Sequence, residues 1–382
     1  MHEPMVWIRG AEVYDPAPRG RMDLLLGGGR VLAMAPRLEP GRGLDVRELR
    51  GEGRLLVPGY VDSLVHVSGG GGEGGFATRT PALAPAQALA AGVTTLVGAL
   101  GTDDVTRSHA DLLASCRALA DHGISAFALT GSYRVPVRTL TGSVRDDLVL
   151  VPDFIGVGEI AIADHRGSQP NAEELARIAA DARVGGLLAG KRGTVLVHVG
   201  DGEEGLALLH ETSDRHHVPV AQWHPTHINR REGLLAMGPA WAARGGTLDL
   251  TTSTSDDLLA AGEVPAAEAL STLLAEGVPP DAISLSSDGQ ASLPNFDGEG
   301  RLLGLEIADI GSLHAALAAA VRGRGLPLEQ VLQTLTSTPA EVWGLRRKGR
   351  LAPGADADLL LLDATTLAIE TVVAAGQVRL GG

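Results

Sequence analysis

Short apolar runs and helical repeats alternate along most of the chain from about residue 59 onward. The runs are nearly continuous in apolar residues, which is typical of strands buried on both faces of a parallel sheet. They lie at 60–67, 93–100, 124–131, 154–162, 194–200, 218–224, 247–253 and 282–288. Amphipathic segments at 111–123, 172–188, 204–217 and 265–277 predict helices between strands. Eight strands in alternation with helices predict an α/β protein, namely a (β/α)8 TIM-like barrel.

The two ends of the chain have a different pattern. Residues 5–57 and 349–380 form short strand-like runs interrupted by Pro and Gly. Neither end can bury an apolar face alone, so we expect the two ends to pair into one small β domain. The predicted domains are therefore residues 1–57 plus 349–382 for the small β domain and residues 58–348 for the barrel. No repeat of 20–50 residues interrupts this scheme.

Composition excludes several classes of protein. The net charge of −14 and the aromatic content of 3% disfavour a nucleic-acid partner, which requires clustered Lys and Arg and stacking side chains. The single cysteine, Cys116, excludes an internal disulfide and lies in an apolar helical pattern typical of a buried thiol. The most apolar stretch, 83–101, is interrupted by polar residues and Pro, so we expect no membrane contact. Because the N-terminus lacks an apolar signal core, we expect a cytoplasmic protein.

Polar residues stand where the predicted strands end, and active groups of such barrels gather at that edge. His66, His198, His227 and Asp288 follow or close four of the strands. One such histidine is unremarkable, but three histidines and a carboxylate on one edge predict a site for zinc or a similar ion. Asp288 could also take a proton from a water molecule that the ion makes acidic. His224, which lies three residues before His227, is expected to have a structural role.

Several motifs resemble a known family closely. They are PGYVDSLVHVSGGGGEGGFATRTP at 58–81, GSYRVPVRTLTGSV at 131–144, IAIADHR at 160–166, VHVGD at 197–201, PTHINR at 225–230 and SSDGQAS at 286–292. This order is similar to that of the isoaspartyl dipeptidases of the amidohydrolase superfamily. The segment KGRLAPGADADLLLLD at 348–363 resembles the C-terminal strand pair of the superfamily, so the resemblance covers essentially the whole chain.

The resemblance implies a two-metal hydrolase that cleaves peptides joined through the aspartate side-chain carboxyl. By position, His66 belongs to the first metal site, and His198 and His227 belong to the second. Asp288 ligates metal and serves as the general base and acid. Tyr133 donates a hydrogen bond to the developing oxyanion.

The resemblance also assigns residues to the substrate. Glu73 meets the substrate α-amino group. Arg166, Arg230 and Ser292 hold carboxylates, while Gly71 and Thr102 line the amino-acid pocket. Asp164 and His165, beside Arg166, are expected to orient their loop. The implied partner is a small dipeptide or another aspartyl derivative, and homo-oligomers are expected because the family often forms them.

Two departures from the family pattern fall on metal ligands. The first strand of the family ends in His-x-His, whereas this chain has Leu64-Val65-His66 and so lacks one donor. At the bridging position the family has a carboxylated lysine, and this chain has Glu159. By ligand count, His198, His227 and Glu159 hold one zinc ion firmly. The first site keeps His66, Asp288 and a share of Glu159, and we expect it to bind weakly.

Three functions are compatible with these residues. The first is metal-dependent hydrolysis of a β-aspartyl dipeptide or a close aspartyl amide. The second is a repurposed enzyme that forms or rearranges an aspartyl-derived amide, because the lost histidine relaxes the metal geometry. The third is a metal-poor, non-catalytic homologue that binds an aspartyl ligand.

Overall fold

The computed structural model describes residues 4–41, 43–296 and 302–381, and it confirms the predicted barrel. Its strands are β6 (Tyr60–Val65), β7 (Val93–Gly98), β8 (Ser125–Thr130), β9 (Phe154–Ile162), β10 (Thr194–Val199), β11 (Trp223–Thr226), β12 (Leu248–Thr251) and β13 (Ile283–Ser286). The first six form one parallel sheet in sequence order, and β12 pairs in parallel with β13. All these strands run in one direction, so their carboxyl ends share one edge.

Two buried carboxylates connect the six-stranded sheet to the β12–β13 pair. Asp249 on β12 accepts hydrogen bonds from Thr226 at 2.8 Å and from Ser286 at 2.5 Å. Asp62 on β6 accepts the Ser287 amide at 3.0 Å and the Ser287 hydroxyl at 2.5 Å. A further backbone bond of 2.8 Å runs from the amide of His66 to the carbonyl of Gly289. Side chains thus stabilise both junctions between the two sheets, β11 with β12 and β13 with β6. Asp288 lies in the segment that makes the second junction.

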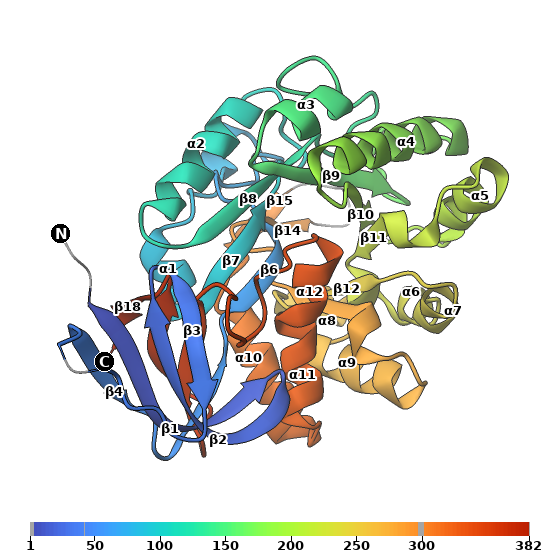
Figure 1. Ribbon diagram of the computed structural model, residues 1–382. Helices are drawn as coiled ribbons and strands as arrows, with labels where there is room; N and C mark the ends of the chain where they lie inside the picture. The colour runs from blue at the N-terminus through green and yellow to red at the C-terminus, as the bar shows by residue number, and fades with distance from the viewer. Residues whose placement is uncertain (1–3, 42, 297–301, 382) are drawn as a thin grey trace.

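Helices surround the barrel (Figure 1). They are α1 (Pro85–Ala90), α2 (His109–Ala120), α3 (Val144–Leu150), α4 (Ala172–Ala189), α5 (Ala207–His216), α6 (Glu232–Leu235), α7 (Gly238–Ala243), α8 (Asp256–Ala260), α9 (Ala266–Ala275), α10 (Ser312–Ala318), α11 (Leu328–Leu335) and α12 (Ser337–Val342). The four helices predicted from amphipathic periodicity correspond to α2, α4, α5 and α9. Helix α4 begins with a capping box in which Asn171 and Glu174 bond each other's backbone amides, which fixes its start.

One predicted strand is misplaced. The apolar run 218–224 was expected to be the sixth barrel strand, but Val220–Gln222 forms a 3-10 turn and β11 begins only at Trp223. Pro219 has no amide hydrogen to donate to a sheet, so the backbone ladder cannot begin there. The hairpin of β14 (Ser292–Phe296) and β15 (Leu302–Ile307) was not predicted.

The two ends of the chain form one sheet, as the sequence predicts. It contains β1 (Met5–Asp15), β2 (Ala17–Gly27), β3 (Arg30–Ala35), β4 (Val46–Arg50), β5 (Arg54–Pro58), β16 (Leu359–Asp363), β17 (Ile369–Ala374) and β18 (Gln377–Leu380). Strand β5 pairs with β1 on one side and with β16 on the other, so it joins the two ends of the chain. Figure 1 shows this sheet beside the barrel.

Successive side chains of β5 and β16 point into two different apolar cores, which explains why both strands are apolar throughout. Leu56 and Leu361 belong to a core inside the small sheet. Leu55 and Leu360, on the opposite face, belong to the large core that includes the barrel helices. Because both faces are buried, neither strand shows the polar alternation of a half-exposed strand.

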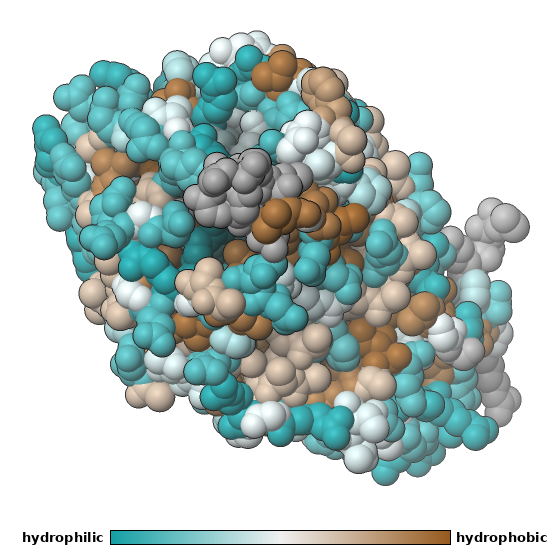
Figure 2. Space-filling model, turned by 180° about the vertical axis from the view of Figure 1, so that it is seen from behind, coloured by the Kyte–Doolittle hydropathy of each residue, from teal (hydrophilic) through white to brown (hydrophobic). Residues whose placement is uncertain are grey.

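No helix within the described residues is long and apolar enough to cross a membrane. Figure 2 shows a face on which hydrophilic residues predominate and apolar residues form several separate groups.

The Asp249 carboxylate, between β11 and β12, should make the free energy of unfolding depend on pH. Burial raises the pKa of Asp249 to about 7, although the Ser284, Ser286 and Thr226 hydroxyls oppose this. Since the folded-state pKa lies above the ordinary value of an aspartate, 3.8, this group contributes stability below about pH 4 that is lost as the pH rises through about 7. The difference in the free energy of unfolding between Asp249→Asn and the unmodified protein should therefore shift in favour of the variant from about pH 5 to about pH 8, because only the unmodified protein must bury a charge.

Urea unfolding midpoints at the two pH values would measure this difference. Asp121→Asn, which changes an exposed carboxyl after α2, is the matched control and should leave the difference unchanged. An identical pH dependence in Asp249→Asn and the unmodified protein would contradict the expectation.

Candidate active site

The carboxyl ends of the barrel strands surround a cavity of about 540 Å³. All of the predicted site residues except His227 line it, namely His66, Gly71, Glu73, Thr102, Tyr133, Glu159, Arg166, His198, Arg230, Asp288 and Ser292. His227 is buried beside the cavity wall and contacts Glu159. The barrel therefore brings together residues that the sequence separates by more than 200 positions.

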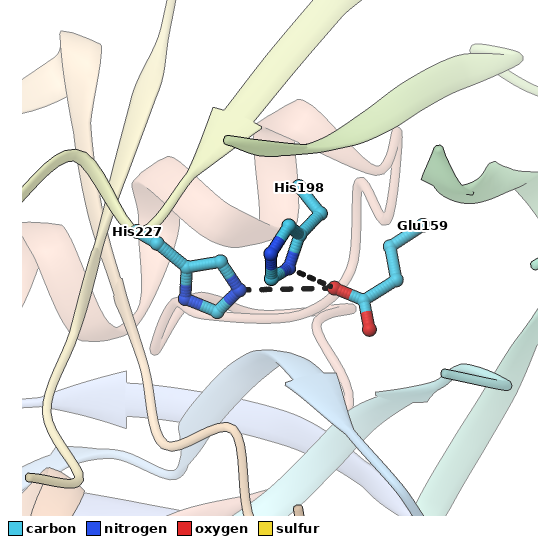
Figure 3. A group of neighbouring side chains, drawn as sticks. All are labelled: Glu159, His198 and His227. Atoms are coloured by element: carbon cyan, nitrogen blue, oxygen red, sulfur yellow. Dashed lines mark hydrogen bonds and ion pairs between the residues drawn. The ribbon is translucent and has the colours of Figure 1, made fainter. Parts of the chain in front are cut away.

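Glu159, His198 and His227 form a compact cluster (Figure 3). Glu159 Oε2 lies 3.3 Å from His198 Nδ1 and 3.7 Å from His227 Nε2. One ligand atom from each residue lies within 4.8 Å of the other two, and all three side chains are buried. Glu159 comes from β9, His198 from β10 and His227 from the end of β11, so three neighbouring strands supply the cluster.

The donor set fits a divalent ion. Burial and the nearby His198 and Arg230 lower the pKa of His227 to about 4, so its imidazole is neutral with a free lone pair near pH 7. Thr251 Oγ1 lies 2.6 Å from His227 Nδ1, which leaves Nε2 facing Glu159. Burial alone would raise the pKa of Glu159, but the adjacent His198 and His227 side chains hold that pKa well below its usual range. Two imidazoles and one carboxylate are a ligand set typical of a zinc site with an open position.

The position of the missing histidine is filled by apolar packing. Leu64 is fully buried and belongs to an apolar cluster inside the barrel that includes Leu129, Leu196 and Trp343. A leucine there offers no donor atom, and its side chain is surrounded by apolar groups. The position at which the resemblance to the isoaspartyl dipeptidases implies a further metal ligand therefore carries no donor atom in this chain.

His66, the remaining histidine of that strand end, contacts two carboxylates. Its Nε2 lies 3.1 Å from Asp288 Oδ1 and 3.5 Å from Glu159 Oε1. Burial would lower the pKa of His66, but the Asp288 and Glu159 carboxylates raise it to about 9. His66 is thus placed between the Glu159 cluster and Asp288, in contact with both.

Two residues of the site adopt the left-handed backbone conformation. The φ angle is 63° at His227 and 54° at Asp288. Non-glycine residues adopt this conformation rarely, and it is concentrated at functional sites because the surrounding structure must hold it in place. At both positions the chain turns sharply out of a barrel strand and aims the side chain toward the cavity edge.

Tyr133 places a hydroxyl beside the cluster. Its Oη lies 2.8 Å from His198 Nδ1. Burial, together with the negative charge of Glu159, raises the pKa of Tyr133 well above its ordinary value. The hydroxyl therefore remains protonated and can donate a hydrogen bond to an oxygen in the cavity.

Glu73 is held at the cavity wall by two hydroxyls. Thr102 donates to Glu73 Oε1 at 3.0 Å, and Ser292 donates to Glu73 Oε2 at 3.2 Å. The loop that carries Glu73 requires glycine at Gly71, where φ is 70° and an added Cβ would lie 2.8 Å from the Thr78 carbonyl oxygen. This places a fixed carboxylate where a positively charged group of a ligand would meet it.

Two arginines face the same space. Arg166 Nη1 lies 3.9 Å from Glu73 Oε1, and the Arg166 guanidinium lies 5.6 Å from the centre of the Tyr133 ring. Arg230 also lines the cavity. Guanidinium groups bind carboxylates with paired hydrogen bonds, so the cavity suits a ligand that carries carboxylates as well as an amine.

Asp164 has contacts that the sequence analysis missed. It was expected only to orient its loop, but its buried carboxylate contacts both Arg166 and His198. The Asp-x-Arg spacing at 164–166 was visible in the sequence, whereas the partner on β10 was not. His165, between them, exposes 86% of its side chain.

The structure supports a structural role for two other residues. His224 is fully buried, and its ring nitrogens lie 2.9 Å from Thr247 Oγ1 and 3.0 Å from Ser284 Oγ. Burial lowers the pKa of His224 to about 3, so it remains a neutral hydrogen-bonding partner between strands. Cys116 is buried, as expected, and burial raises the pKa of its thiol to about 12.

Comparison with known proteins defines the class of this barrel. Residues 55–379 match the model of the amidohydrolase family, so the chain belongs to that family. It is 39% identical to the β-aspartyl dipeptidase of the thermophilic keratin-degrading Fervidobacterium islandicum AW-1, solved in complex with the β-Asp-Leu dipeptide. That match covers 100% of this chain and 97% of the other, with a TM-score of 0.94. A second structure of a β-aspartyl dipeptidase from this bacterium is 37% identical, covers 99% and 97% of the two chains, and has a TM-score of 0.90.

Within the amidohydrolases, this chain is a member of the isoaspartyl (β-aspartyl) dipeptidase family and is a hydrolytic enzyme. A relative with another activity is less similar to this chain. A dihydroorotase of Anaeromyxobacter dehalogenans (strain 2CP-C) is 26% identical over 94% of this chain and 88% of its own length.

Proposed function

We propose that this enzyme hydrolyses the isopeptide bond of β-aspartyl dipeptides. The observation that carries the proposal is the position of Glu73 and Arg166, fixed in the same cavity as the Glu159, His198 and His227 cluster. A β-aspartyl dipeptide carries a free α-amino group and two carboxylates, which match one fixed carboxylate and two guanidinium groups. The solved complex of the similar Fervidobacterium enzyme with β-Asp-Leu supports the same substrate class.

We infer that zinc is the metal and that one ion is firmly bound. Glu159, His198 and His227 would hold it, because they provide three buried donors within 4.8 Å. A second ion would have His66, Asp288 and the far oxygen of Glu159, and Leu64 removes the fourth donor. A divalent ion held by Glu159, His198 and His227 would make a water molecule acidic enough to attack near neutral pH.

The remaining steps belong to the side chains. Asp288 accepts the proton of the attacking water and passes it to the leaving amine as the carbon–nitrogen bond breaks. Tyr133 donates a hydrogen bond to the carbonyl oxygen as it gains negative charge. Glu73 binds the α-amino group with the support of Thr102, while Arg166, Arg230 and Ser292 hold carboxylates and Gly71 keeps the pocket open.

The test compares two isomers. The zinc-loaded protein is mixed with β-Asp-Leu or α-Asp-Leu, and free leucine is measured while elemental analysis gives the zinc content per chain. We expect release of leucine from the β isomer only, loss of activity on chelation, and about one zinc per chain.

Each alternative has its own outcome. Turnover of another aspartyl derivative, without hydrolysis of any β-aspartyl dipeptide, would favour a repurposed enzyme. Dipeptide binding without turnover, unaffected by Asp288→Asn, would favour the non-catalytic homologue.

A further inference from the structure

The carboxylate of Asp164 is shared between two parts of the cavity wall. Asp164 lies in the turn after β9, and only 3% of its side chain is exposed. Its Oδ2 accepts hydrogen bonds from His198 Nε2 at 2.9 Å and from Arg166 Nη2 at 2.7 Å. Its Oδ1 accepts the Arg166 amide at 2.7 Å and Arg166 Nε at 3.1 Å. All four bonds therefore run to two residues, each of which has a separate proposed task.

On the metal side, Asp164 and the proposed ion would occupy opposite nitrogens of one ring. His198 Nδ1 lies 3.3 Å from Glu159 Oε2 and 2.8 Å from Tyr133 Oη, whereas Nε2 lies 2.9 Å from Asp164 Oδ2. A carboxylate on the second nitrogen of a ligating histidine fixes the ring orientation and the tautomer, and makes the first nitrogen a better donor. Asp164 is placed to do this for His198.

On the substrate side, Asp164 fixes one edge of Arg166 and leaves the other edge free. Its two oxygens bind Nε and Nη2, so the Arg166 guanidinium is held in one plane over the Tyr133 ring. Nη1 points toward Glu73 at 3.9 Å and borders the cavity. A guanidinium fixed in this way binds a carboxylate without first losing the freedom of a long side chain.

We propose that Asp164 is a positioning residue for both halves of the site, which orients the metal ligand His198 and the substrate-binding Arg166 through one carboxylate. The inference rests on the proposed function for the identity of the ligand at Arg166. It makes Asp164 the link between metal affinity and dipeptide affinity. Loss of its charge should therefore weaken both, although Asp164 itself touches neither zinc nor dipeptide.

The test uses Asp164→Asn, which keeps the side-chain volume and one acceptor oxygen. Zinc affinity is measured by competition with a chromophoric chelator, and we expect a loss of about 10–100-fold. Dipeptide affinity is measured by calorimetry with β-Asp-Leu on zinc-saturated protein that also carries Asp288→Asn, so that no turnover occurs. There we expect the dissociation constant to rise roughly tenfold, because the Arg166 guanidinium would no longer be fixed in one orientation for binding a carboxylate.

Two control variants separate the two tasks. Arg166→Gln should raise the dipeptide dissociation constant and leave zinc affinity within a few fold. Asp104→Asn changes another buried carboxylate, one that bonds Ser132 at 2.8 Å and pairs with Arg138, and should alter neither quantity.

Unchanged zinc affinity in Asp164→Asn would overturn the metal half of the inference. Unchanged dipeptide affinity at saturating zinc, with binding measurable in its Asp288→Asn parent, would overturn the substrate half. Absence of β-Asp-Leu binding in that parent would instead reject the proposed function, and the substrate half of the inference with it.

Discussion

Asp288→Asn is expected to reduce kcat for β-Asp-Leu by roughly 10²–10⁴-fold, the range that a positioned general base contributes. Asparagine keeps the shape of the side chain but cannot accept the proton of the attacking water. Asp288 lines the cavity, and its Oδ1 lies 3.1 Å from His66 Nε2, so the change removes a carboxylate that can reach a water molecule in the cavity. Because Asp288 lies outside the compact cluster of Glu159, His198 and His227, the variant should still bind about one zinc per chain.

Initial rates with zinc-saturated protein, together with elemental analysis, would measure both effects. Asp309→Asn is a suitable control, because Asp309 lies nearby in sequence and bonds the Gly311 amide at 2.9 Å outside the cavity. A rate in Asp288→Asn above about a tenth of that of the unmodified enzyme would place the base elsewhere.

His198→Ala is expected to abolish firm zinc binding, whereas His66→Ala should retain about one ion per chain. The contrast follows from the geometry. His198 Nδ1 faces Glu159 Oε2 at 3.3 Å within the compact cluster, while His66 contacts the other oxygen, Oε1, at 3.5 Å and has lost its strand partner to Leu64. Removal of His198 leaves two donors for the ion, but removal of His66 leaves all three.

Zinc content after gel filtration, and competition with a chromophoric chelator, would measure the two variants. His224→Ala serves as a matched control for loss of a buried imidazole, since His224 bonds Thr247 and Ser284 away from the cavity. Equal zinc loss in His66→Ala and His198→Ala would show that His66 is an essential ligand and would reject the one-ion proposal.

The alternating pattern of the chain was sufficient to predict the barrel and the sheet formed by its two ends. A strand buried on both faces must be apolar throughout, and such runs are visible without a structure. The prediction placed the sixth strand at 218–224, too early in the chain, because Val220–Gln222 forms a 3-10 turn after Pro219 and the strand begins only at Trp223. Hydrophobicity alone does not distinguish a buried turn from a buried strand.

The candidate site was predictable to the extent that it depends on strand ends. His66, His198 and Asp288 could be grouped because parallel strands bring their carboxyl ends to one edge. The resemblance to the isoaspartyl dipeptidases then supplied residues in loops, such as Glu73 and Tyr133, whose positions no periodicity fixes.

The sequence by itself determined the fold class, the edge of the barrel at which the polar side chains gather, and the leucine at position 64 where the resemblance implies a metal ligand. Only the tertiary structure decided which side chains touch: that Asp164 binds both His198 and Arg166, that Thr102 and Ser292 hold Glu73, and that Asp62 and Asp249 stabilise the junctions between the two sheets. The physical reason is the distance along the chain over which each property is set. Burial follows from the order of apolar and polar residues within one segment, whereas a hydrogen bond depends on the direction of two side chains that meet only after the barrel has closed.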